Sequence, residues 1–251
     1  MNTLNNKTVI ITGGNSGIGY ATAQEMKARG ANVIITGRNQ AAVTKAASEL
    51  GVNGLVADQG DLKAIDKLVA DVKAQHGNVD VLFINAGIGA FLPLHVADEA
   101  HFDSIMNVNF KGAYFTLNKF LPILNEGASV IFLSSVSATT GMPGSSVYSA
   151  SKAALNSLVK VASSELAAKK IRVNAVSPGP IQTPIFGKMG MDEATQQGMA
   201  ETFSNRVPLK RMGQAHEVAK LVTFLAGSDA QFITGADYVV DGGVGVNALM
   251  G

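Results

Sequence analysis

The fold of this chain is decided near its N-terminus, by the sequence TVIITGGNSGIG at residues 8–19. Residues 8–11 form a short, mostly apolar run that predicts a buried strand, and apolar residues from Ile18 to Met26 recur at the spacing of one helix face. Between them stand Gly13, Gly17 and Gly19. These glycines permit a sharp turn and a close approach of the backbone, and the helix N-terminus offers unpaired N–H groups. The stretch therefore predicts a pyrophosphate-binding turn between a strand and a helix.

Six further apolar runs follow, separated by segments with helical spacing, at residues 33–35, 54–57, 81–84, 130–133, 171–176 and 238–240. The runs are continuous rather than alternating, which is typical of strands covered by helices on both faces. Strand–helix alternation favours a parallel sheet with right-handed crossovers. We predict an α/β fold: a Rossmann-type, doubly wound, seven-stranded, mainly parallel sheet with helices on both faces. A single domain should cover residues 1–251, with a substrate-lid insertion at about residues 183–207.

Composition excludes several classes of protein. The chain has 251 residues, a hydrophobic fraction of 47% and a formal net charge of +1, so it lacks the charge bias of a nucleic-acid-binding surface. The absence of cysteine rules out disulfides and thiolate catalysis, and the four histidines do not stand at metal-ligand spacing. No signal peptide or membrane-spanning stretch is apparent. We expect a soluble, cytoplasmic protein with no metal, no nucleic-acid partner and no membrane partner.

Three more motifs stand after predicted strands or at a helix start. They are Asn85-Ala86-Gly87, Tyr148-x-x-x-Lys152 and Pro178-Gly179. Together with the glycine spacing of residues 13–19, they resemble the classical short-chain dehydrogenase/reductase family over essentially the whole chain. The resemblance implies an oxidoreductase that moves a hydride between a nicotinamide cofactor and a ketone, an aldehyde or a secondary alcohol.

The end of the second predicted strand indicates which nicotinamide cofactor is used. Folds that prefer NAD usually carry an acidic side chain there, which binds the ribose 2′-hydroxyl. Residues 27–47 contain no Asp or Glu, and Gly37 and Arg38 stand at the expected position. A guanidinium binds phosphate bidentately and stays charged. We predict NADP(H), with Arg38 as the main selector and Asn15 as a neutral supporting contact; the alternative is that Arg38 is a solvated loop residue.

The resemblance implies further cofactor contacts from the turns that follow the strands. Asp58 would belong to the adenine pocket, although a helix-capping or turn aspartate is the alternative. Thr183 would contact the nicotinamide end. The predicted cofactor-binding residues are Gly13, Asn15, Ser16, Gly17, Ile18, Gly19, Gly37, Arg38, Asn39, Asp58, Gln59, Asn85, Ala86, Gly87, Tyr148, Lys152, Pro178, Gly179, Ile181 and Thr183.

Tyr148 and Lys152 are the first candidates for catalysis. Residues four apart lie on one helix face, and a nearby ammonium lowers the pKa of a phenol from its usual value near 10. Such a pair can exchange a proton with a carbonyl or alcohol oxygen near neutral pH. Ser134 and Ser135 end the fifth predicted strand, at the edge where open α/β sheets bind ligands. The resemblance assigns the catalytic serine to Ser135 and leaves Ser134 a structural role.

Asn109 is the fourth candidate. It falls on the predicted apolar helix face defined by Phe102, Ile105 and Met106, where a buried amide needs a partner. One interpretation is a satisfied core asparagine, at a kink in the helix. The resemblance implies instead a catalytic asparagine whose backbone helps to seat Lys152 through a water molecule. The predicted catalytic set is Asn109, Ser135, Tyr148 and Lys152.

Several functions compete on this fold. The main hypothesis is a reductase of a small apolar ketone, because the predicted pocket segments at residues 88–92, 137–145 and 185–199 carry almost no charge. A 3-oxoacyl-(carrier protein) reductase is the alternative, although residues 125–128 lack the cation that an acidic carrier would favour. A catalytically silent NADP(H)-binding sensor and an epimerase or dehydratase are the other classes considered. The Ala/Ser-rich helix that bears Tyr148 resembles helices that the family pairs between subunits, so we expect a homotetramer.

Overall fold

The structure, a computed structural model, describes residues 4–184 and 192–246. Within them one sheet has the strand order β3-β2-β1-β4-β5-β6-β9, and all six pairs of neighbouring strands run parallel. The predicted Rossmann-type fold with a seven-stranded parallel sheet is confirmed. The strands of this sheet are β1 (Thr8–Ile11), β2 (Asn32–Gly37), β3 (Asn53–Val56), β4 (Val79–Ile84), β5 (Leu124–Leu133), β6 (Arg172–Pro178) and β9 (Asp237–Val240).

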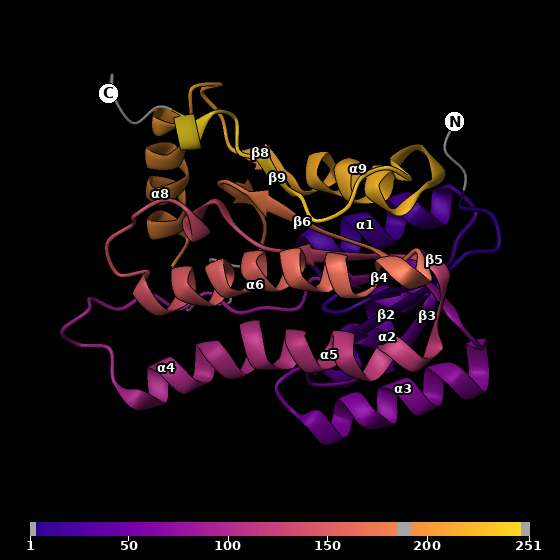
Figure 1. Ribbon diagram of the computed structural model, residues 1–251. Coiled ribbons are helices and arrows are strands. Elements are labelled where there is room, and N and C mark those ends of the chain that lie inside the picture. The colour runs from indigo at the N-terminus through magenta and orange to yellow at the C-terminus, as the bar shows by residue number, and fades with distance from the viewer. Residues whose placement is uncertain (1–3, 185–191, 247–251) are drawn as a thin grey trace.

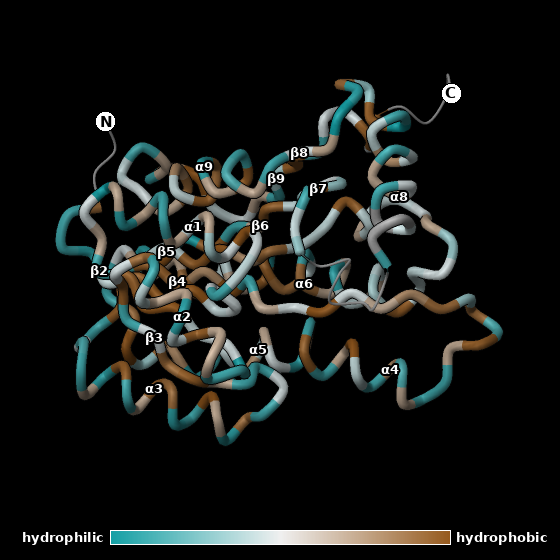
Figure 2. Tube along the Cα trace, turned by 180° about the vertical axis from the view of Figure 1, so that it is seen from behind, coloured by the Kyte–Doolittle hydropathy of each residue, from teal (hydrophilic) through white to brown (hydrophobic). Residues whose placement is uncertain are grey.

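Helices cover both faces of this sheet (Figure 1). One face packs against α1 (Gly17–Ala28), α2 (Gln40–Leu50) and α9 (Ala215–Ala226), and the other packs against α3 (Leu62–His76), α5 (Ala113–Phe120) and α6 (Ser146–Glu165). The strands between these layers are the most hydrophobic part of the trace in Figure 2. Two apolar cores therefore lie on opposite sides of the sheet, as continuous apolar strands require.

The strand order reverses beside β1, and this reversal positions the candidate site. β1 has β2 on one side and β4 on the other, and the register pairs Ile11 with Phe83 and Ile84 with Phe132. The carboxyl ends of β1, β4 and β5 thus meet at one edge of the sheet. Open α/β sheets bind ligands at such a point, because the connections leave it in opposite directions and open a crevice.

A π-helix interrupts the helix expected around Asn109. The chain runs from α4 (Glu99–Met106) through a π-helix at Asn107–Gly112 directly into α5. Asn109 and Ile105 are buried, but Phe102 is 48% exposed, so the expected apolar face does not extend to Phe102. The wider π turn changes which side chains point inward, and it places Asn109 in the interior.

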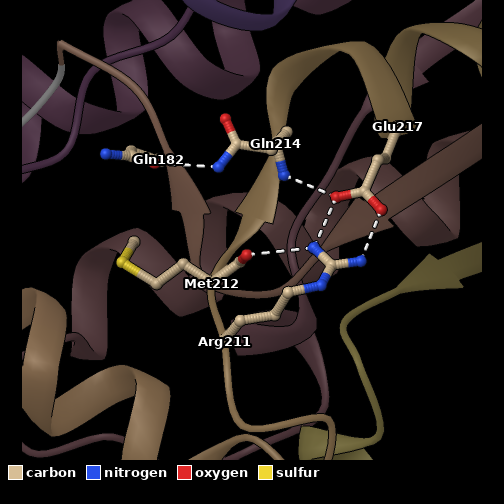
Figure 3. A network of polar contacts seen from close by, with 5 residues as sticks. All are labelled: Gln182, Arg211, Met212, Gln214 and Glu217. Atoms are coloured by element: carbon tan, nitrogen blue, oxygen red, sulfur yellow. Dashed lines mark hydrogen bonds and ion pairs between the residues drawn. The ribbon is translucent and has the colours of Figure 1, made fainter.

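The segment after β6 forms a small arm beside the main sheet. Its strand β7 (Ile181–Gln182) pairs in parallel with β8 (Gly213–Gln214), and α8 (Glu193–Arg206) stands to one side of the central strands (Figure 2). An ion pair between Arg211 and Glu217 braces the arm (Figure 3). The lid predicted at about residues 183–207 therefore corresponds in part to α8, and its residues 185–191 lie outside the described residues.

None of the helices within residues 4–184 and 192–246 combines the length and the apolarity that a helix needs to cross a bilayer.

Candidate active site

The glycine-rich turn after β1 has the geometry of a phosphate cradle. Gly13 and Gly17 adopt φ angles of 64° and 56°, in the left-handed region that favours glycine. At Gly19 a Cβ would lie 2.5 Å from the Gly13 carbonyl oxygen, so only glycine fits there. Residues 17–20, the first turn of α1, include no Asp or Glu. The positive end of the helix dipole therefore faces the turn without an acidic side chain of its own helix.

The floor of the site is a set of hydrogen bonds between β1 and β4. The Thr12 hydroxyl accepts hydrogen bonds from the backbone nitrogens of Asn85 (3.0 Å) and Ala86 (2.9 Å). The Asn85 amide in turn donates to the carbonyl oxygens of Thr12 (2.8 Å) and Gly13 (3.1 Å). The motif at residues 85–87 therefore fixes the glycine turn against the end of β4, because every one of these groups is paired.

A cleft of about 320 Å³ opens above this floor. Many predicted cofactor residues line it: Gly13, Asn15, Ser16, Gly17, Ile18, Gly37, Arg38, Asp58, Gln59, Asn85, Ala86, Gly87 and Thr183. The structure places other predicted residues elsewhere. Asn39 caps α2 by accepting a hydrogen bond from the Ala42 nitrogen, and Ile181 is buried in the core under α9. Gly19, Pro178 and Gly179 also lie outside the lining; Gly179 packs tightly against Asp241.

The end of β2 forms the cleft wall where cofactor choice was predicted. A Cβ on Gly37 would lie 2.6 Å from the Asn15 side-chain oxygen, so the Asn15 amide occupies the space that a larger residue would need. Arg38 follows with an exposed side chain at the mouth of the same cleft. Asp58, which follows the neighbouring strand β3 and also lines the cleft, accepts a hydrogen bond from the Gly60 nitrogen (2.8 Å), which gives it a turn-stabilising role.

Tyr148, Ser135 and Lys152 meet beside this cleft. Tyr148 lies in the first turn of α6, half-buried, and its ring contacts Phe91 edge-on with the centroids 5.5 Å apart. The Ser135 hydroxyl follows β5 and accepts from the Ser137 nitrogen (3.1 Å), and it lies near enough to the Tyr148 phenol to affect the pKa of that group. The structure thus places two hydroxyls together at the edge where parallel strands bind ligands.

Burial dominates the electrostatics of this cluster. It raises the pKa of Tyr148, and the hydrogen bond with Ser135 offsets only part of the rise. Lys152 is 4% exposed, and burial lowers its pKa to about 8. Its Nζ donates to the Leu133 carbonyl oxygen (2.8 Å) and lies 5.8 Å from the Tyr148 ring centroid. The pKa of Tyr148 is therefore raised, contrary to the expected lowering, because the burial of the phenol dominates.

Asn109 is completely buried and anchored on the loop after β4. Its side-chain oxygen accepts from the Ile88 nitrogen (2.8 Å), and its amide donates to the Ile88 carbonyl oxygen (2.9 Å) and to the Ser151 hydroxyl (3.3 Å). The side chain is thus fully satisfied, as one of the two sequence interpretations required. A Cβ added to Gly87 would lie 3.3 Å from the Asn109 oxygen and 3.6 Å from Lys152 Nζ. Asn109 and Lys152 consequently approach the cleft from the same side, behind Gly87.

Some lining residues escaped sequence reasoning. Ala57 and Leu133 line the cleft and are the sequence neighbours of Asp58 and Ser134. Their positions at the ends of predicted strands could have identified them. Val108 also lines the cleft because it lies in the π-helix, and no pattern in the sequence predicts a π-helix there. Within residues 4–184 and 192–246, no group of three or more potential metal ligands comes together.

Comparison with known proteins gives a consistent result. A family profile described as "Enoyl-(Acyl carrier protein) reductase" matches residues 13–245. The chain is 40% identical to "Oxidoreductase asL5" of Sarocladium schorii, with 96% of each chain covered. It is 37% identical to "3-oxoacyl-[acyl-carrier-protein] reductase FabG" of Thermotoga maritima, over 96% of this chain and 98% of the relative.

A solved structure extends the likeness to three dimensions. Levodione reductase superposes with a TM-score of 0.91 at 31% identity, over 96% of this chain and 98% of that chain. The cleft, the cluster around Tyr148 and these full-length similarities agree on one family. The chain belongs to the classical short-chain dehydrogenase/reductase family, whose members are oxidoreductases that use NAD(P)(H).

Proposed function

We propose that the protein is an NADP(H)-dependent oxidoreductase that interconverts a ketone or aldehyde and a secondary alcohol, with Tyr148 as general acid and base. The observation that carries the proposal is the buried Lys152, whose Nζ lies 5.8 Å from the Tyr148 ring centroid, at the sheet edge that also carries Ser135. Two hydroxyls that share one region of space can both hydrogen-bond a single substrate oxygen. A purely structural tyrosine would not require a buried lysine next to it, because burying an ammonium is costly.

The residues of the cleft fit a dinucleotide. The turn at residues 13–19 leaves no room for a side chain at Gly13, Gly14 or Gly19, and its helix N-terminus suits a pyrophosphate. Ser16 and Ile18 of the turn, Ala86 and Gly87 above the floor, and Thr183 of the arm would hold the cofactor along the cleft. When bound, the nicotinamide supplies or accepts the hydride.

The choice of NADP(H) follows from charge at the end of β2. Gly37 offers no carboxylate to a ribose hydroxyl, and its missing side chain makes space for the Asn15 amide. The exposed guanidinium of Arg38 stands at the cleft mouth, where it would bind a 2′-phosphate bidentately. Asp58, which also lines the cleft, would face the adenine.

Each catalytic side chain has a proposed role in the proton transfer. Tyr148 donates its phenolic proton to the carbonyl oxygen in reduction, and the raised pKa keeps that proton in place at neutral pH. Ser135 holds the same oxygen through its hydroxyl. Lys152 supplies positive charge that favours the phenolate once the proton has left. Asn109 would link Lys152 to solvent through its backbone and a water molecule.

The apolar walls favour a small apolar ketone as the substrate. Phe91 contacts Tyr148 directly, and Leu92 is fixed by a hydrogen bond from its nitrogen to the Gly144 carbonyl oxygen (2.9 Å). An apolar wall against the reacting phenol selects apolar substituents on the carbonyl carbon. A second candidate, 3-oxoacyl-(carrier protein) reduction, is favoured by the similarity to the Thermotoga maritima relative of that name.

We also propose a homotetramer. Apolar side chains are exposed on the helices of one layer, with Tyr114 of α5 at 41% and Val161 of α6 at 53%. Light scattering after size exclusion should give about four times the chain mass of 26.0 kDa. A monomer would refute this part of the proposal without affecting the chemistry.

The deciding experiment follows absorbance at 340 nm with NADPH or NADH over aryl-alkyl ketones and acetoacetyl thioesters. NADPH should be consumed with ketones, and NADH should be consumed much more slowly.

Tyr148→Phe should lower kcat by roughly 100- to 10,000-fold, whereas Tyr20→Phe, a control on α1, should have no effect. Arg38→Gln should raise the KM for NADPH by about tenfold and spare that for NADH, with Arg206→Gln as the matched control. Preference for thioesters over ketones would favour the carrier-protein candidate, and tight NADPH binding without turnover would favour a sensor.

A further inference from the structure

The side chain of Gln59 connects two parts of the candidate site. Gln59 follows Asp58 after β3 and is 7% exposed. Its amide nitrogen donates to the Ala86 carbonyl oxygen (2.8 Å) and to the Val108 carbonyl oxygen (3.0 Å). Ala86 belongs to the cleft floor, and Val108 immediately precedes Asn109. One amide group therefore joins the end of β4 to the helix that carries Asn109.

The helix at this contact is the π-helix of residues 107–112. Its wider turn loosens the regular ladder of backbone hydrogen bonds, so such turns persist where other groups support them. Gln59 gives that support from outside the helix, at the Val108 carbonyl. Asn109 then faces the loop after β4, where it makes two hydrogen bonds to the backbone of Ile88.

The backbone of Gln59 is also pressed against the π-helix. A Cβ on Gly112 would lie 2.1 Å from the Gln59 carbonyl oxygen, which no side chain could tolerate. Gly112 is the last residue of the π-helix, so Gln59 contacts the helix near both of its ends. This close approach leaves the side-chain amide little freedom to move away from Val108.

The side-chain oxygen of Gln59 is in an energetically unfavourable position. The side-chain oxygen is buried and finds no hydrogen-bond partner among the residues that the structure describes. An unpaired buried acceptor is unfavourable, and a flipped amide would be worse, because its oxygen would face two carbonyl oxygens. A residue that served only to fill space would be apolar here. The role of Gln59 therefore lies in the two hydrogen bonds that its amide nitrogen donates.

We propose that Gln59 is a positioning residue, whose amide holds the π-helix against the cleft floor so that Asn109 keeps its place behind Gly87 and beside Lys152. The role rests on the proposed function in so far as Asn109 acts in proton transfer. It also connects the two ends of the cleft, since Asp58, the neighbour of Gln59, lines the same cleft as Gly87. Gln59 itself touches no reacting atom.

The test compares Gln59→Leu with Gln75→Leu, the same change at an exposed site on α3. Gln59→Leu places a shorter, apolar side chain in the same space and removes both hydrogen bonds. We expect kcat for ketone reduction to fall on the order of tenfold, the equivalent of one or two net hydrogen bonds, with the KM of the ketone little changed. Gln75→Leu should leave both parameters as they are. A kcat within twofold of the wild-type value in folded Gln59→Leu would overturn the proposal.

A second readout does not depend on turnover. Amide hydrogen exchange in residues 107–112 should be faster by about tenfold or more in Gln59→Leu than in the wild-type protein, while exchange in α6 stays the same. Unchanged exchange in residues 107–112 would also overturn the proposal. If the wild-type protein reduces no carbonyl, the proposed function fails, and the exchange experiment still tests the role of Gln59.

Gln59→Glu keeps the proposal testable if the leucine variant does not fold. A carboxylate would face the carbonyl oxygens of Ala86 and Val108, whereas the protonated acid can donate one hydrogen bond. Exchange in residues 107–112 of this variant should therefore slow as the pH falls, and the wild-type protein should show no such change beyond the intrinsic pH dependence of exchange. Equal pH dependence in both proteins would contradict a donor role for residue 59.

Discussion

The cleft floor and the arm at β7 and β8 both shape the candidate site, but they are held by different kinds of interaction. On the floor, the buried Thr12 and the half-buried Asn85 take part in four neutral hydrogen bonds. In the arm, Arg211 binds Glu217 through two contacts of 2.8 and 2.7 Å, with side chains 53% and 32% exposed. Gln214 extends this network to Gln182 of β7 (Figure 3).

The two kinds of interaction indicate that the cleft floor is rigid and that the arm is more adjustable. Buried hydrogen bonds without water as a competitor are costly to leave unmade, so the floor admits few alternatives. Exposed ion pairs contribute little free energy, because water and salt screen them. The arm, which carries Thr183 to the cleft, therefore depends on weaker contacts than the floor of the cleft. Substitutions in the two regions should differ in size and even in sign.

The largest contrast should come from one substitution made in both regions. In Gly19→Ala the new methyl group would lie 2.5 Å from the Gly13 carbonyl oxygen and 2.6 Å from the Asn85 amide nitrogen. We expect a loss of at least about 2 kcal/mol in the free energy of unfolding and loss of measurable NADPH binding. Denaturant titration and cofactor fluorescence would measure both.

Gly198→Ala in α8 provides the matched control. Among the residues that the structure describes, nothing lies within 4 Å of a Cβ at this position. Alanine is the better helix former, so we expect a gain of up to about 1 kcal/mol in stability. Equal effects at positions 19 and 198 would break the comparison, because the floor would then be no more constrained than the arm.

Thr12→Val tests the hydrogen bonds of the floor without changing the shape of the side chain. The valine would leave the backbone nitrogens of Asn85 and Ala86 without their acceptor in a buried place. We expect a loss of about 2 kcal/mol in the free energy of unfolding and weaker NADPH binding. Thr12→Ser, which keeps the hydroxyl, should lose much less. If both variants unfold at the same denaturant concentration, the hydroxyl is not what holds the floor.

Lys152→Met should stabilise the protein while it abolishes activity. Burial lowers the pKa of Lys152 from 10.5 to about 8, so below pH 8 the folded protein carries a poorly solvated ammonium. Removing it should raise the free energy of unfolding at pH 7 by about 1 to 3 kcal/mol.

The pH dependence of this gain has a definite sign. Between about pH 8 and 10.5 the unfolded chain binds more protons at residue 152 than the folded protein, so wild-type stability rises there relative to the variant. The advantage of the variant should therefore be full below pH 8 and shrink toward pH 10.5. Calorimetry at pH 7 and pH 9.5 would measure it, and a gap that widens with pH would contradict the assignment of a buried charge.

The smallest effect should come from Glu217→Gln in the first turn of α9, where the side chain binds Arg211 of the arm. The hydrogen bonds from Arg211 and from the Gln214 nitrogen lower the pKa of Glu217 from 4.5 to about 2. This group therefore stabilises the folded state above pH 4.5, and the contribution is lost as the pH falls toward 2. We expect a fall in Tm of roughly 1 to 3 °C at pH 7, and a smaller difference from the wild-type protein at pH 3.

Glu126→Gln supplies the reference for an ordinary surface pair. Glu126 contacts Lys170 with side chains 67% and 76% exposed, and its loss should leave Tm unchanged within error. A fall in Tm for Glu217→Gln as large as that for Thr12→Val would remove the distinction between arm and floor.

Local patterns explain why much of the site could be predicted. Gly13, Gly17 and Gly19 stand in a turn that only glycine permits, and their spacing is visible in the sequence. The continuous apolar run of each strand likewise predicts that the strand is buried. The edge where the strands end then brings Thr12, Asn85 and Ser135 together by topology. Asn39 shows the limit of this reasoning, because nothing local distinguishes a cofactor contact from the cap of α2 that the structure shows.

Apolar runs and glycine spacing are local signals, so they predicted the parallel sheet and the sharp turn after its first strand. The grouping of Asn109, Ser135, Tyr148 and Lys152 was instead predicted from the family resemblance. Only the tertiary structure decided the ionisation of these residues and their support. Burial raises the pKa of Tyr148 and lowers that of Lys152, and this depends on every atom packed around them. The π-helix and its contact with Gln59 depend on two segments about 50 residues apart in sequence, which no local pattern specifies.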